Sequence, residues 1–233
     1  MSISKKRQTT DRTYTMGEEK HQLKVSSTER DLGVVLDDKL TFENHLQSKI
    51  NKANSIMGII RRTYTYLDND SFLLLYKALV RPHVEYANQI WSPYLKKHII
   101  SIENVQRRAT KQIAGMRDLT YEERLHKLKL PTLAYRRLRG DMIETYKILS
   151  EKYDKEASDG LFETARTSTR GHSLKLAKKH CNTNIRKFSF TFRVIDTWNS
   201  LPEYVVTSTS VKSFEAQLDK HWTNHPLKYN YNN

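Results

Sequence analysis

The sequence predicts a mainly α-helical fold with a short N-terminal β-hairpin and a basic, helix-rich C-terminal module. Apolar residues recur every three or four positions through three long segments, as on one face of an α-helix. A run of β-branched residues precedes these segments and favours a short strand. With only 7 glycines in 233 residues, the chain has little material for phosphate-binding glycine loops.

Residues 12–36 are expected to form the hairpin, after a basic, flexible terminus at residues 1–11. Apolar and polar side chains alternate at Leu23-Lys24-Val25, and Leu32-Gly33-Val34-Val35-Leu36 contains a β-branched run. Gly17 and Gly33 indicate turns or bulges. The segment therefore predicts short strands that bend at these glycines.

A helical domain is expected over residues 37–150. Its first helix follows Thr41, a candidate N-cap, and its apolar face comprises Phe42, Leu46, Ile50, Ala53, Met57 and Ile60. A second helix is expected over residues 70–79. Pro82 suits the first turn of a third, and Pro93 separates that helix from a segment that begins near Lys96.

Two further helices have clear apolar faces with arginines beside them. In residues 99–116 the apolar face comprises Ile102, Val105, Ala109, Ile113 and Met116, and Arg107, Arg108 and Lys111 project from the opposite side. In the helix that begins near Pro131 it comprises Tyr135, Leu138, Met142, Tyr146 and Leu149. Arg136 and Arg137 lie off that stripe, and Arg139 borders it.

The C-terminal part is more polar. Residues 151–169 are charged and rich in Ser and Thr, which favours a linker. Residues 170–222 form the basic module, which ends in a helix over residues 211–222. Residues 223–233 are expected to be a flexible tail.

Positive charge is concentrated in two regions of this chain, whose net charge is +14. Residues 96–139 contain twelve basic and four acidic residues, and residues 166–193 contain eight basic residues and no acidic ones. Such clustering favours a phosphate backbone as the partner. A solvated basic face and an anionic membrane surface are the alternatives.

We expect RNA or the backbone of an RNA–DNA duplex to be that partner. The candidate contact residues are Arg107, Arg108, Lys111, Arg136, Arg137, Arg170, His172, Lys175, Lys178, Lys179, Arg186 and Lys187. Phe188, Phe190 and Phe192 alternate among these cations. Burial in the core is the favoured interpretation of the three rings, and stacking on unpaired bases is the alternative.

The sequence predicts no catalytic site, metal site or cofactor. Phosphate-binding glycine loops, the HExxH motif and the GxSxG motif are missing. Asp37-Asp38 resembles a polymerase metal pair, but the pair directly precedes a helix, so a capping or loop role is favoured. His172, His180 and Cys181 match no common zinc spacing and are expected in an exposed loop. Glu103 and Glu122 are expected to be surface charges.

The sequence also indicates the cellular compartment of the protein. The N-terminus has no apolar core of a signal peptide, and the longest apolar run, at residues 72–76, is too short to cross a bilayer. A single cysteine, Cys181, excludes an internal disulfide. We expect a soluble intracellular protein, in the nucleus or the cytoplasm.

Seven motifs in order carry a resemblance to one family. They are Asp31-Leu32-Gly33-Val34-Val35-Leu36-Asp37 with Leu40-Thr41-Phe42 and His45; Arg81-Pro82-His83-Val84-Glu85-Tyr86-Ala87 with Trp91-Ser92-Pro93; Ile102-Glu103-Asn104-Val105-Gln106-Arg107-Arg108-Ala109; Arg136-Arg137-Leu138-Arg139-Gly140-Asp141-Met142; Tyr146-Lys147-Ile148-Leu149; Arg170-Gly171-His172-Ser173; and Phe192-Arg193-Val194 with Trp198-Asn199-Ser200-Leu201-Pro202. Over residues 14–222 the chain resembles the part of Jockey-like LINE (non-LTR) retrotransposon reverse transcriptases, which are RNA-directed DNA polymerases, that follows the catalytic palm.

This resemblance implies a helical, thumb-like domain that tracks the template–primer duplex, followed by a further C-terminal part. The family's endonuclease, fingers and aspartate-bearing palm motifs would lie upstream and, in a full-length element, would be partners of this region. The chain is therefore expected not to be an enzyme on its own. A host RNA-binding adaptor, a structural remnant without function and an enzyme with an unrecognised site are the alternatives.

Overall fold

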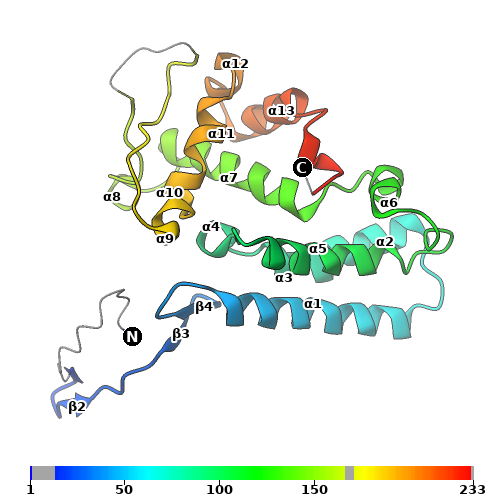
Figure 1. Cartoon of the computed structure of the whole chain (residues 1–233), viewed down its shortest axis with the longest axis horizontal. Coiled ribbons are helices and arrows are strands. Elements are labelled where there is room, and N and C mark those ends of the chain that lie inside the picture. Colours follow the sequence, from blue (N-terminus) through cyan, green and yellow to red (C-terminus); the bar gives the residue numbers. More distant parts are fainter. Residues whose placement is uncertain (2–13, 166–170, 232–233) are drawn as a thin grey trace.

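The structure, a computed structural model, describes residue 1, residues 14–165 and residues 171–231. It confirms the mainly α fold with small antiparallel hairpins at its N-terminal end. Figure 1 shows the arrangement: α1 lies along one side, α2–α5 form a middle layer, and α7 with the C-terminal helices covers the other side.

The N-terminal region contains two hairpins. β1 (Thr15–Met16) pairs with β2 (His21–Gln22), and β3 (Thr28–Asp31) pairs with β4 (Val34–Asp37). Leu32 and Gly33 form the second turn, with φ of 43° and 83°. Two successive residues of positive φ suit the right-handed twist of the paired strands. The predicted strand at Leu23-Lys24-Val25 is wrong, because those residues are exposed and pair with no other strand.

Helix α1 (Glu43–Thr63) buries the predicted apolar face against the rest of the first core. Thr41 is not its N-cap: Phe42 occupies that position, with a left-handed φ of 56°. The carboxylate of Asp37 organises the turn instead. It accepts the backbone N–H groups of Lys39, Thr41 and Phe42, at 3.1, 3.0 and 2.7 Å, and the Thr41 hydroxyl.

The helices of the middle layer begin and end near the prolines of the sequence, as predicted. α2 (Asn69–Leu75) continues into one π-helical turn, η1 (Tyr76–Val80), and then into α3 (Arg81–Glu85), whose first turn holds Pro82 as predicted. Because Pro82 has no N–H to donate, the wide turn before it avoids the regular bond to Ala78. α4 (Asn88–Trp91) and α5 (Lys96–Thr110) flank Pro93.

The next helix was not predicted. α6 (Tyr121–Leu128) begins with a capping box in which Thr120 and Glu123 exchange hydrogen bonds. The spacing Thr120-x-x-Glu123 is the sequence signal that could have located it. α7 (Leu133–Leu149) follows, capped by the Thr132 hydroxyl, which accepts the Tyr135 N–H at 3.0 Å.

The C-terminal part consists mostly of short helices. They are α8 (Lys155–Ser158), α9 (Asn184–Lys187), α10 (Phe190–Arg193), α11 (Ile195–Asn199), α12 (Glu203–Val206), α13 (Val211–His221) and the 3-10 turn η2 (Pro226–Lys228). Trp198 is fully buried among them, and its indole N–H donates to the Leu174 carbonyl at 2.8 Å. The predicted linker makes one isolated bridge to this part, between Thr164 and Leu176.

Two hydrophobic cores form within the described residues. The first joins α1–α6 and ends at Leu133. Tyr135, Met142 and Tyr146 of α7 belong instead to the second core, with Trp198. α7 therefore presents its apolar face to the C-terminal helices across the expected domain boundary at residue 150, and that boundary stays a prediction.

Residues 227–231, within the expected flexible tail, contact the rest of the structure. The Thr132 N–H and hydroxyl donate to the Lys228 and Leu227 carbonyls, at 2.9 and 2.5 Å. The ring of Tyr229 lies 3.9 Å from that of His126, and Tyr231 packs against the first core. Backbone hydrogen bonds and aromatic packing thus hold residues 227–231 in place.

His45 gives the fold a pH dependence that can be measured. It is fully buried, and its Nδ1 accepts the Val35 N–H at 3.1 Å. Burial, with smaller contributions from Lys49 and Arg30, lowers the pKa of His45 from 6.5 to about 4. Between those values the unfolded chain binds one more proton at this residue than the folded chain does. Stability conferred by neutral His45 is therefore lost as the pH falls below 6.5, by up to about 1.4 kcal/mol per pH unit.

We expect His45→Asn, which keeps an acceptor near Nδ1, to remove this contribution. Urea unfolding of both proteins at several pH values between 7.5 and 4.5 should show a difference in stability that shrinks or reverses as the pH falls. Parallel curves for the two proteins would show that His45 does not titrate in this way.

Candidate nucleic-acid interface

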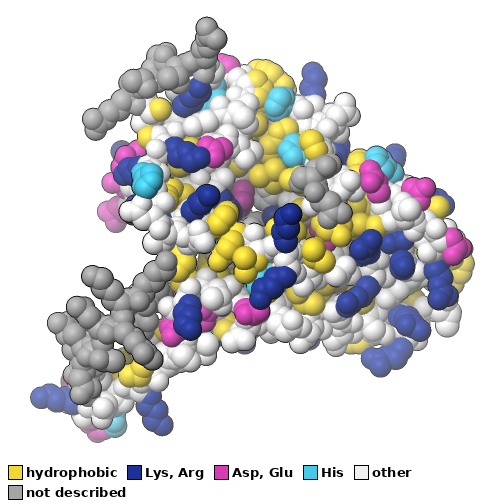
Figure 2. Space-filling model, viewed as in Figure 1, with side chains coloured by type: hydrophobic (Ala, Val, Ile, Leu, Met, Phe, Trp, Pro, Cys, Tyr) yellow, Lys and Arg dark blue, Asp and Glu magenta, His cyan; other side chains and the backbone are white. Residues whose placement is uncertain are grey.

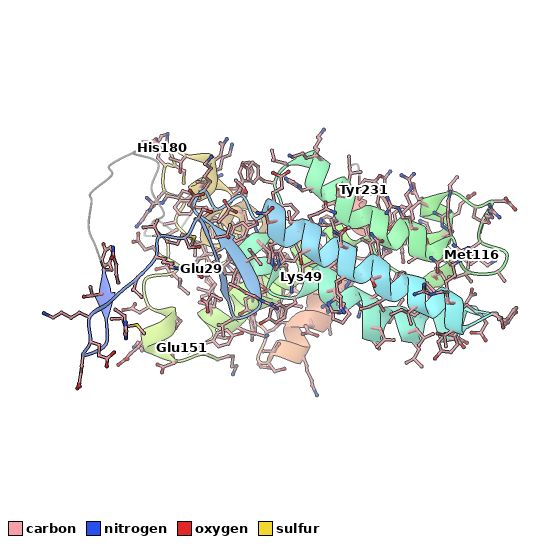
Figure 3. The ribbon with its side chains drawn as sticks, turned by 90° about the horizontal axis from the view of Figure 1, so that it is seen from below. Glu29, Lys49, Met116, Glu151, His180 and Tyr231 are labelled. Carbon is pink, nitrogen blue, oxygen red and sulfur yellow. The ribbon has the colours of Figure 1, made fainter. Side chains whose placement is uncertain are left out.

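A polar surface depression lies between α1 and α5. These helices pack side by side, and Figure 3 shows α1 with Lys49 on it, beside the segment that leads to Met116. We call this depression the α1–α5 groove. It is lined by Gln47, Ile50, Asn51, Asn54, Ser101, Asn104 and Arg108, has a volume of about 220 Å³, and continues beside the start of both helices as a second hollow of about 130 Å³.

The groove is lined by amides, hydroxyls and cations. The Gln47 amide N–H donates to the Asn51 side-chain oxygen at 2.8 Å, so both amides are held in place along one edge of α1. Amide, hydroxyl and guanidinium groups can all donate to phosphate and sugar oxygens. The groove therefore offers hydrogen-bond donors along its length.

Acidic side chains are scarce on α1 and α5. Together these helices carry eight Lys and Arg residues but only two glutamates, Glu43 and Glu103. Glu43 is neutralised by Lys97, with 2.9 Å between Nζ and Oε1, and Glu103 is buried. Lys and Arg side chains gather where α1 and α5 end, with Asp and Glu at the margin (Figure 2).

We give the name α1–α5 surface to the α1–α5 groove together with the exposed Lys and Arg side chains of α1 and of the end of α5, which are Lys52, Arg61, Arg62, Arg107, Arg108 and Lys111. Arg107, Arg108 and Lys111 are exposed, as the sequence predicted. Arg108 lines the groove, and the Arg107 guanidinium lies 5.7 Å from the centre of the Tyr121 ring. Their contact with phosphate stays a prediction.

Sequence reasoning missed the contribution of α1. Lys52, Arg61 and Arg62 are exposed on it, and Lys49 is partly exposed. The signal was present, because residues 44–67 contain four Lys or Arg and no Asp or Glu.

The arginines of α7 do not belong to this surface. Arg137 is only 6% exposed, so little of its side chain is at the surface, and its contact with nucleic acid stays a prediction. Arg136 forms a two-point ion pair with the partly buried carboxylate of Glu85, and Arg139 pairs with Asp219 at 2.6 Å. The positive charge counted over residues 96–139 is thus partly internal.

In the basic C-terminal stretch, several residues that were predicted to contact nucleic acid bind other residues of the chain. His172 is 3% exposed, and its Nε2 lies 2.9 Å from the Trp198 carbonyl oxygen, so its placement in an exposed loop was wrong. Lys178 pairs with Asp196 and Lys179 with Glu163. Lys175 is partly exposed, Arg186 and Lys187 are exposed, and Arg170 lies outside the described residues.

Asp37, one of the two acidic residues that resemble a polymerase metal pair, takes part in hydrogen bonds of the fold. Asp37 forms the turn before α1, which confirms its loop role. Burial alone would raise the pKa of its carboxyl, but the four hydrogen bonds in that turn lower it. Within residues 14–165 and 171–231, no cluster of three or more His, Cys, Asp or Glu side chains is arranged to hold a metal ion. In the same ranges no helix is long and apolar enough to span a bilayer.

Glu103 was wrongly predicted to lie at the surface. It is 1% exposed and accepts the Tyr121 hydroxyl at 2.5 Å and the N–H groups of Leu133 and Ala134 at 3.2 and 3.3 Å. Burial raises the pKa of its carboxyl, while these donors and the positive charge of Arg137 oppose that rise. The residue ties α5, α6 and α7 together. Glu122, in contrast, is exposed as predicted.

Comparison with known proteins supports the resemblance in part. Over 110 residues the chain is 32% identical to a Drosophila melanogaster protein described as "Probable RNA-directed DNA polymerase from transposon X-element". The match covers 44% of this chain and 12% of that protein. A region of this chain is therefore similar to a retrotransposon polymerase. No family model and no solved structure matches the chain.

Because Glu103 is buried beside Arg137, its removal should cost much more stability than the loss of an exposed glutamate. We expect Glu103→Ala to lower the free energy of unfolding by about 3–5 kcal/mol, because it removes the opposite charge that acts on the buried Arg137 guanidinium and leaves the Tyr121 hydroxyl without its acceptor. Glu122→Ala should cost at most about 1 kcal/mol, from its place near the start of α6. Urea denaturation measures both, and equal losses would contradict the assigned role of Glu103.

Proposed function

We propose that this chain binds RNA or the RNA–DNA duplex of a template and primer through the α1–α5 surface, as a non-catalytic part of a reverse transcriptase. The observation that carries the proposal is the near absence of unpaired carboxylates from α1 and α5 beside their eight cations. A surface that only kept a globular protein soluble would mix both signs of charge. This one is suited to a polyanion.

The shape of the surface supports a backbone grip. α5 has 15 residues, so it extends about 22 Å at 1.5 Å per residue. Donors lie along it from Ser101 through Asn104 to Arg108, and the α1 amides face them across the groove. Contacts of this kind position a duplex without identifying its bases, so binding should be largely independent of sequence.

The partial similarity to a transposon polymerase supports the same proposal. The placement that we propose is after the catalytic palm, in the thumb-like position of a Jockey-like element. In that setting the palm and fingers would belong to upstream sequence, and this chain would hold the product duplex while chemistry takes place elsewhere.

The salt dependence of binding tests the grip. If about six phosphates are engaged, log affinity should fall against log salt with a slope of roughly −4 to −5. Combined replacement of Arg107, Arg108 and Lys111 by alanine should flatten that slope by about three units at most. Filter binding or fluorescence anisotropy with an RNA–DNA hybrid measures the slope.

The matched control for this experiment is a triple variant, Lys152→Ala with Lys155→Ala and Lys212→Ala. These residues are exposed and lie outside α1 and α5, and the variant loses the same net charge. An equal effect of both triple variants would assign binding to overall charge and overturn the proposed surface.

A single substitution tests the groove more finely. Asn51→Asp keeps an acceptor for the Gln47 amide but places a carboxylate among the groove donors. We expect a several-fold loss of affinity at low salt that diminishes as salt screens the new charge. Asn69→Asp, at the exposed start of α2, adds the same charge elsewhere and should change affinity little. Indifference to Asn51→Asp would exclude the groove as a path for phosphates.

A further inference from the structure

A second cavity lies in the C-terminal part, outside the α1–α5 surface. Its volume is about 580 Å³, within the range of about 300–1,000 Å³ typical of ligand sites. It opens between residues 178–181 and the helices α9 and α10. Its walls are Lys178, Lys179, His180, Cys181, Lys187, Phe188, Phe192, Arg193 and Asp196.

Two aromatic rings form the apolar wall of this cavity. Phe188 and Phe192 are half-buried, and Phe188 lies parallel to Tyr94, with ring centres 4.4 Å apart and 3° between the planes. Phe190 packs instead against Phe162 and the second core. The alternating phenylalanines therefore divide into one that supports the core and two that line the cavity.

Cations lie directly beside both rings. Lys187 Nζ is 5.6 Å from the centre of the Phe188 ring, and the Arg186 guanidinium carbon is 5.0 Å from that of Phe192. Lys178, Lys179 and Arg193 already pair with carboxylates. Among the described residues, no carboxylate pairs with Lys187. The cavity thus combines aromatic faces with an unneutralised ammonium group.

The position of the cavity relates it to the groove. Tyr94, stacked on Phe188, lies two residues before α5 begins, and Lys97 at the start of α5 reaches Glu43 at the start of α1. In Figure 3 His180 lies at the end where α1 begins, and Met116 at the opposite end. The cavity therefore lies near the end of the α1–α5 groove at which both helices begin.

We propose that this cavity binds an unpaired nucleotide of a strand that leaves the duplex held on the α1–α5 surface. The base stacks on Phe188 or Phe192, and Lys187 pairs with a phosphate. Aromatic rings beside cations are the usual elements of single-strand binding. This inference rests on the proposed duplex binding and adds a site for bases to it.

The test compares three forms of one labelled RNA–DNA hybrid by fluorescence anisotropy. The first form is blunt, the second carries three unpaired nucleotides at one end, and the third carries three abasic nucleotides at the same position. The second and third forms are each made with the extension at one end and at the other. The abasic form keeps the phosphates and removes the stacking. We expect the form with bases to bind about five-fold or more tightly than the abasic form, the effect of one stacked base.

Conservative variants locate the effect. Phe188→Leu and Phe192→Leu should each reduce the preference for bases over abasic nucleotides and leave blunt-hybrid affinity unchanged. Phe190→Leu is the matched control and should keep the preference, because Phe190 does not line the cavity. Circular dichroism and thermal melting show whether each variant is folded.

The outcomes separate this inference from the proposed function. Equal affinity for the forms with and without bases would overturn the nucleotide site and leave duplex binding in place. Failure to bind the blunt hybrid would overturn the proposed function itself. Displacement of the unpaired bases, but not of the duplex, by a poly-glutamate peptide would assign the cavity to an acidic protein segment and also overturn the inference.

Discussion

The carboxylate of Glu103, buried where α5, α6 and α7 meet, is the constraint on which the helical part depends. A buried charge is costly unless every oxygen is engaged. Here Tyr121, Leu133 and Ala134 supply hydrogen bonds, and Arg137 supplies the opposite charge. Meeting these needs together fixes the rotation of α5 about its axis. The opposite side of α5, with Arg108, is thereby turned toward α1 and solvent.

A second buried charge joins the two cores. The Arg193 guanidinium grips both oxygens of Asp141 on α7, each at 2.9 Å, and also reaches the carbonyls of Asn88 and Gln89 in α4. One side chain of the C-terminal part thus spans the second core and the middle layer. The cavity beside Phe188 is built on this fixed junction, so its distance from the start of α5 is set by the fold rather than by a hinge.

Much of the helical fold could be predicted because amphipathic spacing is local. The apolar faces of α1, α5 and α7 are seen within single windows of sequence. Periodicity failed for Glu103 and Arg137, because it treats a charged residue as exposed and cannot identify a partner that is distant in sequence. It missed the α1–α5 groove for the same reason, since the groove exists only once two helices 33 residues apart lie side by side. The exposed Arg107 and Arg108 needed no such knowledge.

The hydrogen bonds between Thr132 and the residues of η2 affect the order in which the chain folds. The bond from the Thr132 hydroxyl to the Leu227 carbonyl joins positions 95 residues apart. Contacts of long sequence separation bear a large loop-closure entropy until the intervening segments have condensed. The turn η2 can therefore form its contacts with Thr132 only after both hydrophobic cores have folded. Protection of the backbone amides near Lys228 from hydrogen exchange thus marks the last step of folding.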